Sequence, residues 1–344
     1  MDMNLPSENG DADDTDERIA PSDPDMSMTG SGDASVVAVA PASAPAARST
    51  DHATPNPGGN SMSIPAQIVE GLYNGRVIPY LGPAVLELVP GGSPVPRTPE
   101  GLVGILTSRV SVPHRIRGKL TAAAQFVENF KHRKTLVKHM ADAFTPSVVP
   151  SPLHSLVAAL PLPLPLVVDT WYDDAMSAAL AGRKDWGQVQ GLAQSEHFGT
   201  WYAHYDAAGA AVPDYLPGQW KTLLYKPLGG HWPADNFLVS DSDHVEVLTE
   251  IDIQTPIPSE VQRLRVGCHF VFLGCRFNDQ LTRSFARQIM KRSSDLHWAV
   301  LPGALTRMEQ RFLAEQRIQR IDVSLEEFVT NLQHALRQRD KAAA

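Results

Sequence analysis

From about residue 64 onward, the hydrophobic residues follow two patterns. Short runs that are apolar throughout alternate with longer segments whose apolar residues return every three or four positions. Uninterrupted apolar runs are typical of strands buried on both faces of a parallel sheet, and the longer segments are typical of helices with one buried face. The alternation predicts a three-layer, Rossmann-like α/β domain with a mostly parallel sheet. The expected strands are 76–81, 164–170, 222–226, 236–240, 268–274, 296–301 and 319–323.

The domain is expected to span residues 63–340 and to carry insertions. Residues 101–145 have a helical pattern, which predicts a helical insertion. Residues 182–220 are aromatic but only weakly periodic, which predicts an irregular insertion. Later in the chain, Thr306 and Ser324 each stand three residues before a glutamate, the spacing of a capping box at a helix start.

The first 62 residues differ in composition from the rest of the chain. They hold eleven acidic residues against two arginines, and they contain none of the aromatic residues. A segment rich in Asp, Ser, Pro, Gly and Ala without aromatic anchors buries too little apolar surface to offset its ordering entropy. We therefore expect a disordered acidic tail over residues 1–62, and the net charge of −8 describes this tail more than the domain.

Cysteine and histidine usage excludes several kinds of site. Two cysteines, Cys268 and Cys275, rule out a disulfide scaffold and a four-cysteine zinc module. We expect both to be small buried residues in a reducing cytoplasm. The twelve histidines include no close pair backed by carboxylates, so no metal site is expected.

Membranes and nucleic acids are not expected partners. The most apolar stretch, residues 153–168, is short and contains three prolines, and the acidic start of the chain lacks a signal-peptide design. The basic run 131–134 is expected to be a solvated helix face, since the domain has almost no net positive charge. These features predict a cytoplasmic protein with no membrane span and no general nucleic-acid binding.

Candidate functional residues follow the expected strands, because parallel sheets bind ligands in the crevice at the carboxyl ends of their strands. Gly82 and Ala84 follow the first strand, where small residues let a phosphate approach the backbone. The other loops in such positions are 170–173, 226–231 and 274–279.

Together these loops resemble motifs of the sirtuin-like superfamily, and in particular its bacterial branch without a zinc module. Residues 80–85 look like the loop that ends the first strand with Gly-Ala-Gly. Residues 153–161 with 167–173 resemble the segment that ends in Thr-Thr-Asn-Tyr-Asp, and 226–229 lie where the family has Lys-Leu-His-Gly. Residues 270–279 are similar to the late Gly-x-Ser strand and its downstream acid.

The resemblance, which runs collinearly over about residues 64–337, implies a site for NAD as ligand or substrate. Gly82 and Ala84 would face the pyrophosphate, with Gly274, Cys275 and Arg276 on the adenosine or phosphate side. The full set of implied nucleotide-binding residues is Gly82, Ala84, Thr170, Trp171, Tyr172, Gly274, Cys275 and Arg276.

The departures from the family pattern bear on catalysis. Trp171 stands where the family has an asparagine, Leu228 stands where it has a histidine, and Pro83 and Ala84 replace the last two residues of the phosphate loop. Cleaving the nicotinamide–ribose bond builds positive charge on the ribose, so it needs a positioned polar group and a base. Trp and Leu supply neither.

His231 and Asp173 are the candidates for displaced catalytic residues. Three hypotheses follow. The chain binds NAD or an ADP-ribose derivative with weak or no turnover, as a sensor or regulator; or it is an NAD glycohydrolase that uses displaced residues; or it is an interaction scaffold with an empty pocket. Protein deacylation is the least expected family activity, because the four-cysteine zinc module is absent. A protein partner encoded nearby fits each hypothesis.

Overall fold

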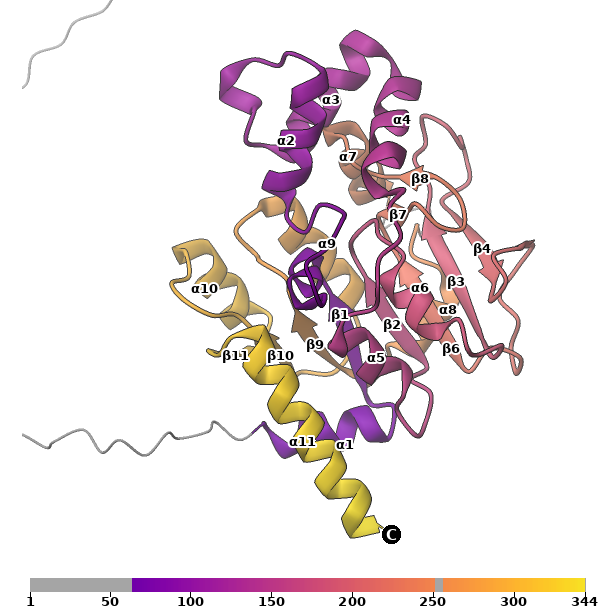
Figure 1. The fold of residues 1–344 in the computed structure, drawn as a ribbon, viewed down its shortest axis with the longest axis vertical. Helices are drawn as coiled ribbons and strands as arrows, with labels where there is room; N and C mark the ends of the chain where they lie inside the picture. The colour runs from indigo at the N-terminus through magenta and orange to yellow at the C-terminus, as the bar shows by residue number, and fades with distance from the viewer. Residues whose placement is uncertain (1–63, 251–255, 344) are drawn as a thin grey trace, which may run out of the picture. The chain divides into compact units, whose positions relative to one another are not determined.

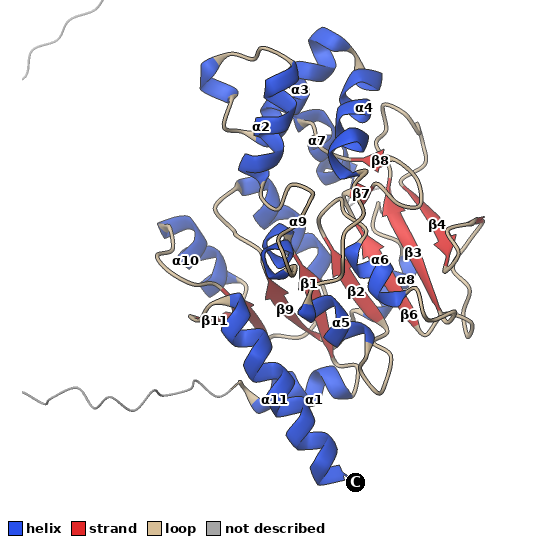
Figure 2. Ribbon diagram, viewed as in Figure 1, coloured by secondary structure: helices blue, strands red, loops and turns tan. Residues whose placement is uncertain are grey.

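A nine-stranded sheet, of which seven strands run parallel, forms the centre of the described part of the protein. The structure is a computed structural model that describes residues 64–250 and 256–343, so the expected tail lies outside the described residues. The strand order is β11-β10-β9-β1-β2-β6-β3-β4-β5, in which β4 pairs antiparallel with β3 and β5 pairs antiparallel with β4 (Figure 2). The strands are β1 (Val77–Leu81), β2 (Leu166–Asp169), β3 (Trp186–Gly191), β4 (Tyr202–Asp206), β5 (Ala211–Val212), β6 (Thr222–Lys226), β9 (His269–Leu273), β10 (His297–Val300) and β11 (Ile318–Ile321). A separate hairpin pairs β7 (Gly229–Gly230) with β8 (Asn236–Phe237).

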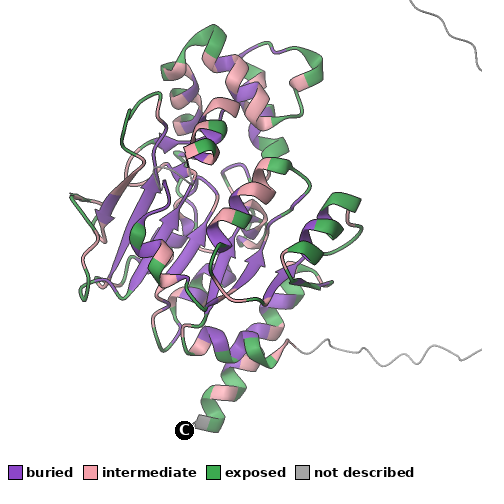
Figure 3. Cartoon of the chain, turned by 180° about the vertical axis from the view of Figure 1, so that it is seen from behind, coloured by how far each residue is buried: buried purple, intermediate pink, exposed green. Residues whose placement is uncertain are grey.

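Helices cover both faces of this sheet, which confirms the three-layer α/β fold. Alternate side chains of a strand point to opposite faces, so in β1 Val77 and Leu81 join one core while Ile78 and Tyr80 join the other. The sheet is accordingly buried throughout its centre (Figure 3). One face packs against α1 (Ala66–Tyr73), α5 (Pro152–Ala158), α6 (Ala175–Leu180) and α11 (Leu325–Ala343). The other face packs against α7 (Asp241–Glu250), α8 (Ser259–Leu264), α9 (Gln280–Met290) and α10 (Arg307–Glu315).

Three further helices form a cap at the carboxyl ends of the strands (Figure 1). They are α2 (Pro99–Arg109), α3 (Leu120–Lys131) and α4 (Arg133–Phe144), with the 3-10 turns η1 (Pro83–Leu88) and η2 (His114–Ile116) beside them. Their apolar residues form a third core, which also takes in Trp171, Tyr172 and Phe237 from the strand-end loops. The cap therefore covers the end of the sheet where a ligand crevice is expected.

Residues 182–220, whose weak periodicity suggests an irregular insertion, contain β3, β4 and β5. The polar side chains Gln188 and Gln190 interrupt the apolar run of β3, yet both are fully buried. Their amide nitrogens donate to the Trp232 carbonyl at 2.8 and 2.7 Å. A buried strand whose polar groups are satisfied by tertiary partners has no apolar signature in the sequence.

The basic run 131–134 is not entirely solvated. Arg133 points inward, where its guanidinium pairs with the buried Asp243 at 2.8 Å and with Glu196 at 3.0 Å. Because Asp243 lies on α7, this ion pair joins the cap to the sheet domain. The capping box of Thr306 with Glu309 forms as predicted, and Ser324 accepts from the Glu327 amide at 3.1 Å. No helix of the described part is long and apolar enough to cross a membrane.

Candidate functional site

The expected crevice lies where chain order reverses in the sheet, between β1 and β9. From β1 the chain continues to β2 on one side, and it returns to β9 on the other. Such a switch point is the usual ligand crevice of an open parallel sheet. The structure brings Gly82, Thr170 and Gly274 together here, since each follows one of three neighbouring strands.

The loop after β1 is closed against the end of β9. The Gly82 amide donates to the Leu273 carbonyl at 2.9 Å, and the Ala84 amide donates to the Gly274 carbonyl at 3.1 Å. A Cβ at Gly82 would lie 2.5 Å from the Gly274 oxygen and 2.7 Å from the Cys275 sulfur. Gly82 is therefore required for close packing of the chain on itself.

The following turn offers no free backbone donor either. Pro83 has no N–H group, and the Val85 amide donates back to the Gly82 carbonyl at 3.1 Å. The donors that a phosphate would use at a helix start are thus satisfied internally. These residues, as they are arranged, do not fit a pyrophosphate.

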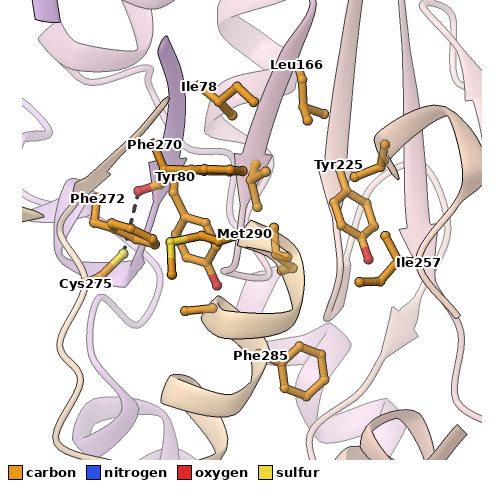
Figure 4. Close-up of a cluster of buried hydrophobic side chains, with 14 of the residues drawn as sticks. Ile78, Tyr80, Leu166, Tyr225, Ile257, Phe270, Phe272, Cys275, Phe285 and Met290 are labelled. Atoms are coloured by element: carbon orange, nitrogen blue, oxygen red, sulfur yellow. Dashed lines mark hydrogen bonds between the residues drawn. The ribbon is translucent and has the colours of Figure 1, made fainter. Parts of the chain in front are cut away.

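Cys275 and Arg276 follow β9 but turn in different directions. The Cys275 thiol lies 3.6 Å from the Tyr80 carbonyl oxygen, among aromatic side chains (Figure 4), and burial raises its pKa well above the usual range. Arg276 extends toward α10, where it pairs with Glu309 at 3.0 Å and donates to the Ala304 carbonyl. Cys275 thus belongs to the core, and the Arg276 charge is already compensated.

The loop after β2 is fixed by its own polar groups. The amide and the hydroxyl of Thr170 both donate to the Leu81 carbonyl at 2.9 Å. The Trp171 indole nitrogen donates to the Pro96 carbonyl at 2.7 Å, and the Tyr172 hydroxyl donates to the Leu238 carbonyl at 2.7 Å. Both rings contact Phe144 of α4 edge-on, so they fill the space beneath the cap.

A buried ion pair lies beside this loop. The Lys226 ammonium donates to Asp169 at 2.7 Å and to the Asp173 carbonyl at 2.9 Å, and the Lys226 side chain is 1% exposed. Burial raises the pKa of Asp169, and the neighbouring ammonium offsets part of that rise. Burial also raises the pKa of Asp173, whose carboxylate accepts from the Ala175 amide at the start of α6. The Asp173 carboxylate therefore serves as a hydrogen-bond acceptor at the start of α6.

His231 is the most accessible of the predicted catalytic residues. Its Nδ1 lies 2.7 Å from the Asp235 carboxylate, and its side chain is 26% exposed. Its backbone amide donates to the Tyr172 carbonyl at 2.9 Å, which places the imidazole beside the loop after β2. A carboxylate on Nδ1 fixes ring orientation and leaves Nε2 as the proton acceptor.

Sequence reasoning missed two of the polar pairs. Asp235 stands four residues after His231, a spacing that could have been noticed. Asp169 and Lys226 each end an apolar strand, and only the pairing of β2 with β6 places them together. Within the described ranges, no group of three or more His, Cys, Asp or Glu side chains is placed to hold a metal ion.

Comparison with known proteins gives a family model and a solved structure that are similar to this chain. The family model described as SIR2-like domain matches residues 165–321, which run from β2 to β11. A solved structure described as "Structural Basis for the Mechanism and Regulation of Sir2 Enzymes" covers 80% of this chain and 98% of its own, with 11% sequence identity and a TM-score of 0.37. No curated protein matches the chain.

Proposed function

We propose that this chain is a non-hydrolytic member of the sirtuin-like superfamily, a regulatory or interaction protein that does not cleave NAD, and the SIR2-like family model that matches residues 165–321 supports this placement. The match to the SIR2-like family model supports an NAD-related function in general terms and does not specify an activity. The observation that carries the proposal is the closed crevice, in which the Gly82 and Ala84 amides donate to the chain's own carbonyls.

Nucleotide binding at this loop would carry a structural cost. NAD or an ADP-ribose derivative would have to separate the loop from β9, which leaves the carbonyls of Leu273 and Gly274 without their partners. Two backbone hydrogen bonds are worth about 1–3 kcal/mol together, or a factor of roughly 5 to 150 in affinity. We therefore expect any nucleotide in this crevice to bind weakly.

Two side chains that depart from the family pattern, Trp171 and Leu228, also argue against cleavage of NAD. Trp171 is 4% exposed in an aromatic cluster, and Leu228 packs against the same core. A missing polar group costs about 10² to 10³ in rate, and a missing general base costs about 10² to 10⁴. From a typical turnover of about 10 per second, both losses leave at most about 10⁻³ per second.

One arrangement favours a second candidate, an NAD glycohydrolase. His231, held by Asp235 and placed beside Tyr172, has the orientation of a general base. The segment that follows it is anchored to β3 and β4, since the Asn236 amide donates to Gln190 at 2.6 Å and to the Tyr205 hydroxyl at 3.0 Å. This candidate also requires the crevice to open.

Nicotinamide release from NAD distinguishes the two candidates. For the wild-type protein we expect a rate below about 10⁻³ per second, with His231→Ala changing it less than about threefold. His197→Ala, in an exposed turn, is the matched control. Release above about 0.1 per second that is lost in His231→Ala and kept in His197→Ala would establish the glycohydrolase instead. A fall in cellular NAD on overexpression would do the same for an enzyme that needs a partner.

A further inference from the structure

A cavity of about 880 Å³ lies between α1 and α11, at the amino ends of the strands. These two helices lie side by side at the opposite end of the sheet from the cap (Figure 1). The size falls within the range of pockets for small organic ligands. The cavity is thus separate from the crevice at the carboxyl ends.

Nine of the fourteen residues that line this cavity have polar or charged side chains. Stripes of α1 and α11 supply its walls, including the amide side chains of Gln67, Asn331 and Gln338. Arg76 and His269, at the amino ends of β1 and β9, also line it, and His334 of α11 adds a second imidazole. Such groups donate hydrogen bonds to oxygen atoms of a ligand.

The lining of the cavity has a net positive charge, because Glu70 pairs with Arg339 and Arg76 remains as a second cation. Arg339 binds both oxygens of Glu70 at 2.8 Å, and its guanidinium lies 3.3 Å from the centroid of the Tyr73 ring. Glu70 is thereby neutralised, and this contact joins the two helices. Arg76 is exposed, lies beside the Cys268 thiol and forms no ion pair with a carboxylate of the described residues. Its guanidinium therefore keeps an uncompensated charge.

We propose that this α1–α11 cavity binds a small organic anion, a molecule of nucleotide or sugar-phosphate size that carries a phosphate or carboxylate group. The Arg76 guanidinium binds the oxyanion, for which its planar fork is well suited. The amide side chains and the imidazoles bind the remaining oxygen atoms of the ligand. The proposal does not depend on the crevice at the carboxyl ends.

Calorimetric titration tests this site, with AMP as the phosphate probe and citrate as the carboxylate probe. We expect at least one probe to bind the wild-type protein, with an affinity that falls as salt is added. Arg76→Gln should weaken that binding at least about tenfold, and His334→Ala should weaken it by a smaller factor. Arg337→Gln, an exposed arginine of α11 that does not line the cavity, should stay within about twofold.

Two results would overturn the proposal. One is no heat from either probe at about 10 mM, a concentration well above typical metabolite affinities. The other is equal binding by Arg76→Gln and Arg337→Gln, which would place the anion elsewhere. Far-UV circular dichroism confirms that each variant is folded, and His334→Ala tests the site if Arg76→Gln does not fold. Nicotinamide release is measured separately, so either proposal can fail alone.

Discussion

Replacing Lys226 with methionine perturbs the most deeply buried charge at the carboxyl ends of the strands. The change removes the ammonium that pairs with Asp169 and also bonds to the Asp173 carbonyl. Methionine keeps an unbranched chain of similar length, so the main loss is electrostatic. The Asp169 carboxylate is then left buried, with the Trp171 amide as its remaining hydrogen-bond donor in the described part.

Breaking a buried ion pair from one side costs about 3–5 kcal/mol, because the other charge stays desolvated. We expect Lys226→Met to lower the free energy of unfolding by that amount in urea melts at about pH 7.5. The double variant Lys226→Met with Asp169→Asn removes both charges, and Asn can still accept from the Trp171 amide. Its loss should be at least about 1 kcal/mol smaller than that of the single variant.

The pH dependence of this loss follows from the raised pKa of Asp169. Without Lys226 the pKa rises further, so the folded state keeps a proton that the unfolded state releases above about pH 3.9. Stability of the variant therefore falls as pH rises through that window, and its deficit against wild type shrinks toward about pH 4.5. A deficit below about 1 kcal/mol at pH 7.5, or one that does not shrink in acid, would refute this reasoning.

Three other predictions concern packing and accessibility. Arg133→Met should lower the free energy of unfolding in urea melts by about 3 kcal/mol, because Asp243 loses its partner. Replacing the exposed neighbour, Lys134→Met, should change it by no more than about 0.5 kcal/mol. Equal effects would mean that the inward ion pair contributes nothing to stability. Gly82→Ala should destabilise the folded protein by about 1–3 kcal/mol, since the added Cβ meets backbone atoms. The control Gly104→Ala, where the Cβ meets open space on an exposed helix face, should be neutral or stabilising. A melting temperature unchanged by Gly82→Ala would contradict the closed loop. Both thiols should react with maleimide at least about 100-fold more slowly in native than in urea-unfolded protein, because both are buried with raised pKa values. Rapid native labelling of Cys275 would show that the carboxyl end of β9 is open.

Most of the sheet could be predicted from the sequence because its strands are buried on both faces. The run from Phe270 to Leu273 is apolar for that reason, and Gly274, with φ of +70°, ends it as a turn residue should. The capping box at Thr306 was readable because it depends on residues three positions apart. The sequence therefore predicts those elements whose stabilising contacts are either close along the chain or purely apolar.

The closure of the crevice could not be predicted in this way. A glycine after a first strand fits both a phosphate and a close approach of another chain segment, and only the position of β9 shows that Gly82 packs against Gly274. The inward turn of Arg133 likewise depends on Asp243, which is far away in the sequence. These contacts are tertiary, so spacing along the chain carries no trace of them.

Hydrogen exchange at residues 80–86 tests the closed crevice most directly. We expect the amides of Gly82 and Ala84 to be protected in the free protein, since both donate to carbonyls at the end of β9. We also expect NAD at about 5 mM to leave their exchange unchanged, because nucleotide binding there is weak. Rapid exchange of these amides in the free protein, or strong new protection on adding NAD, would contradict the account and identify the loop as a working nucleotide site.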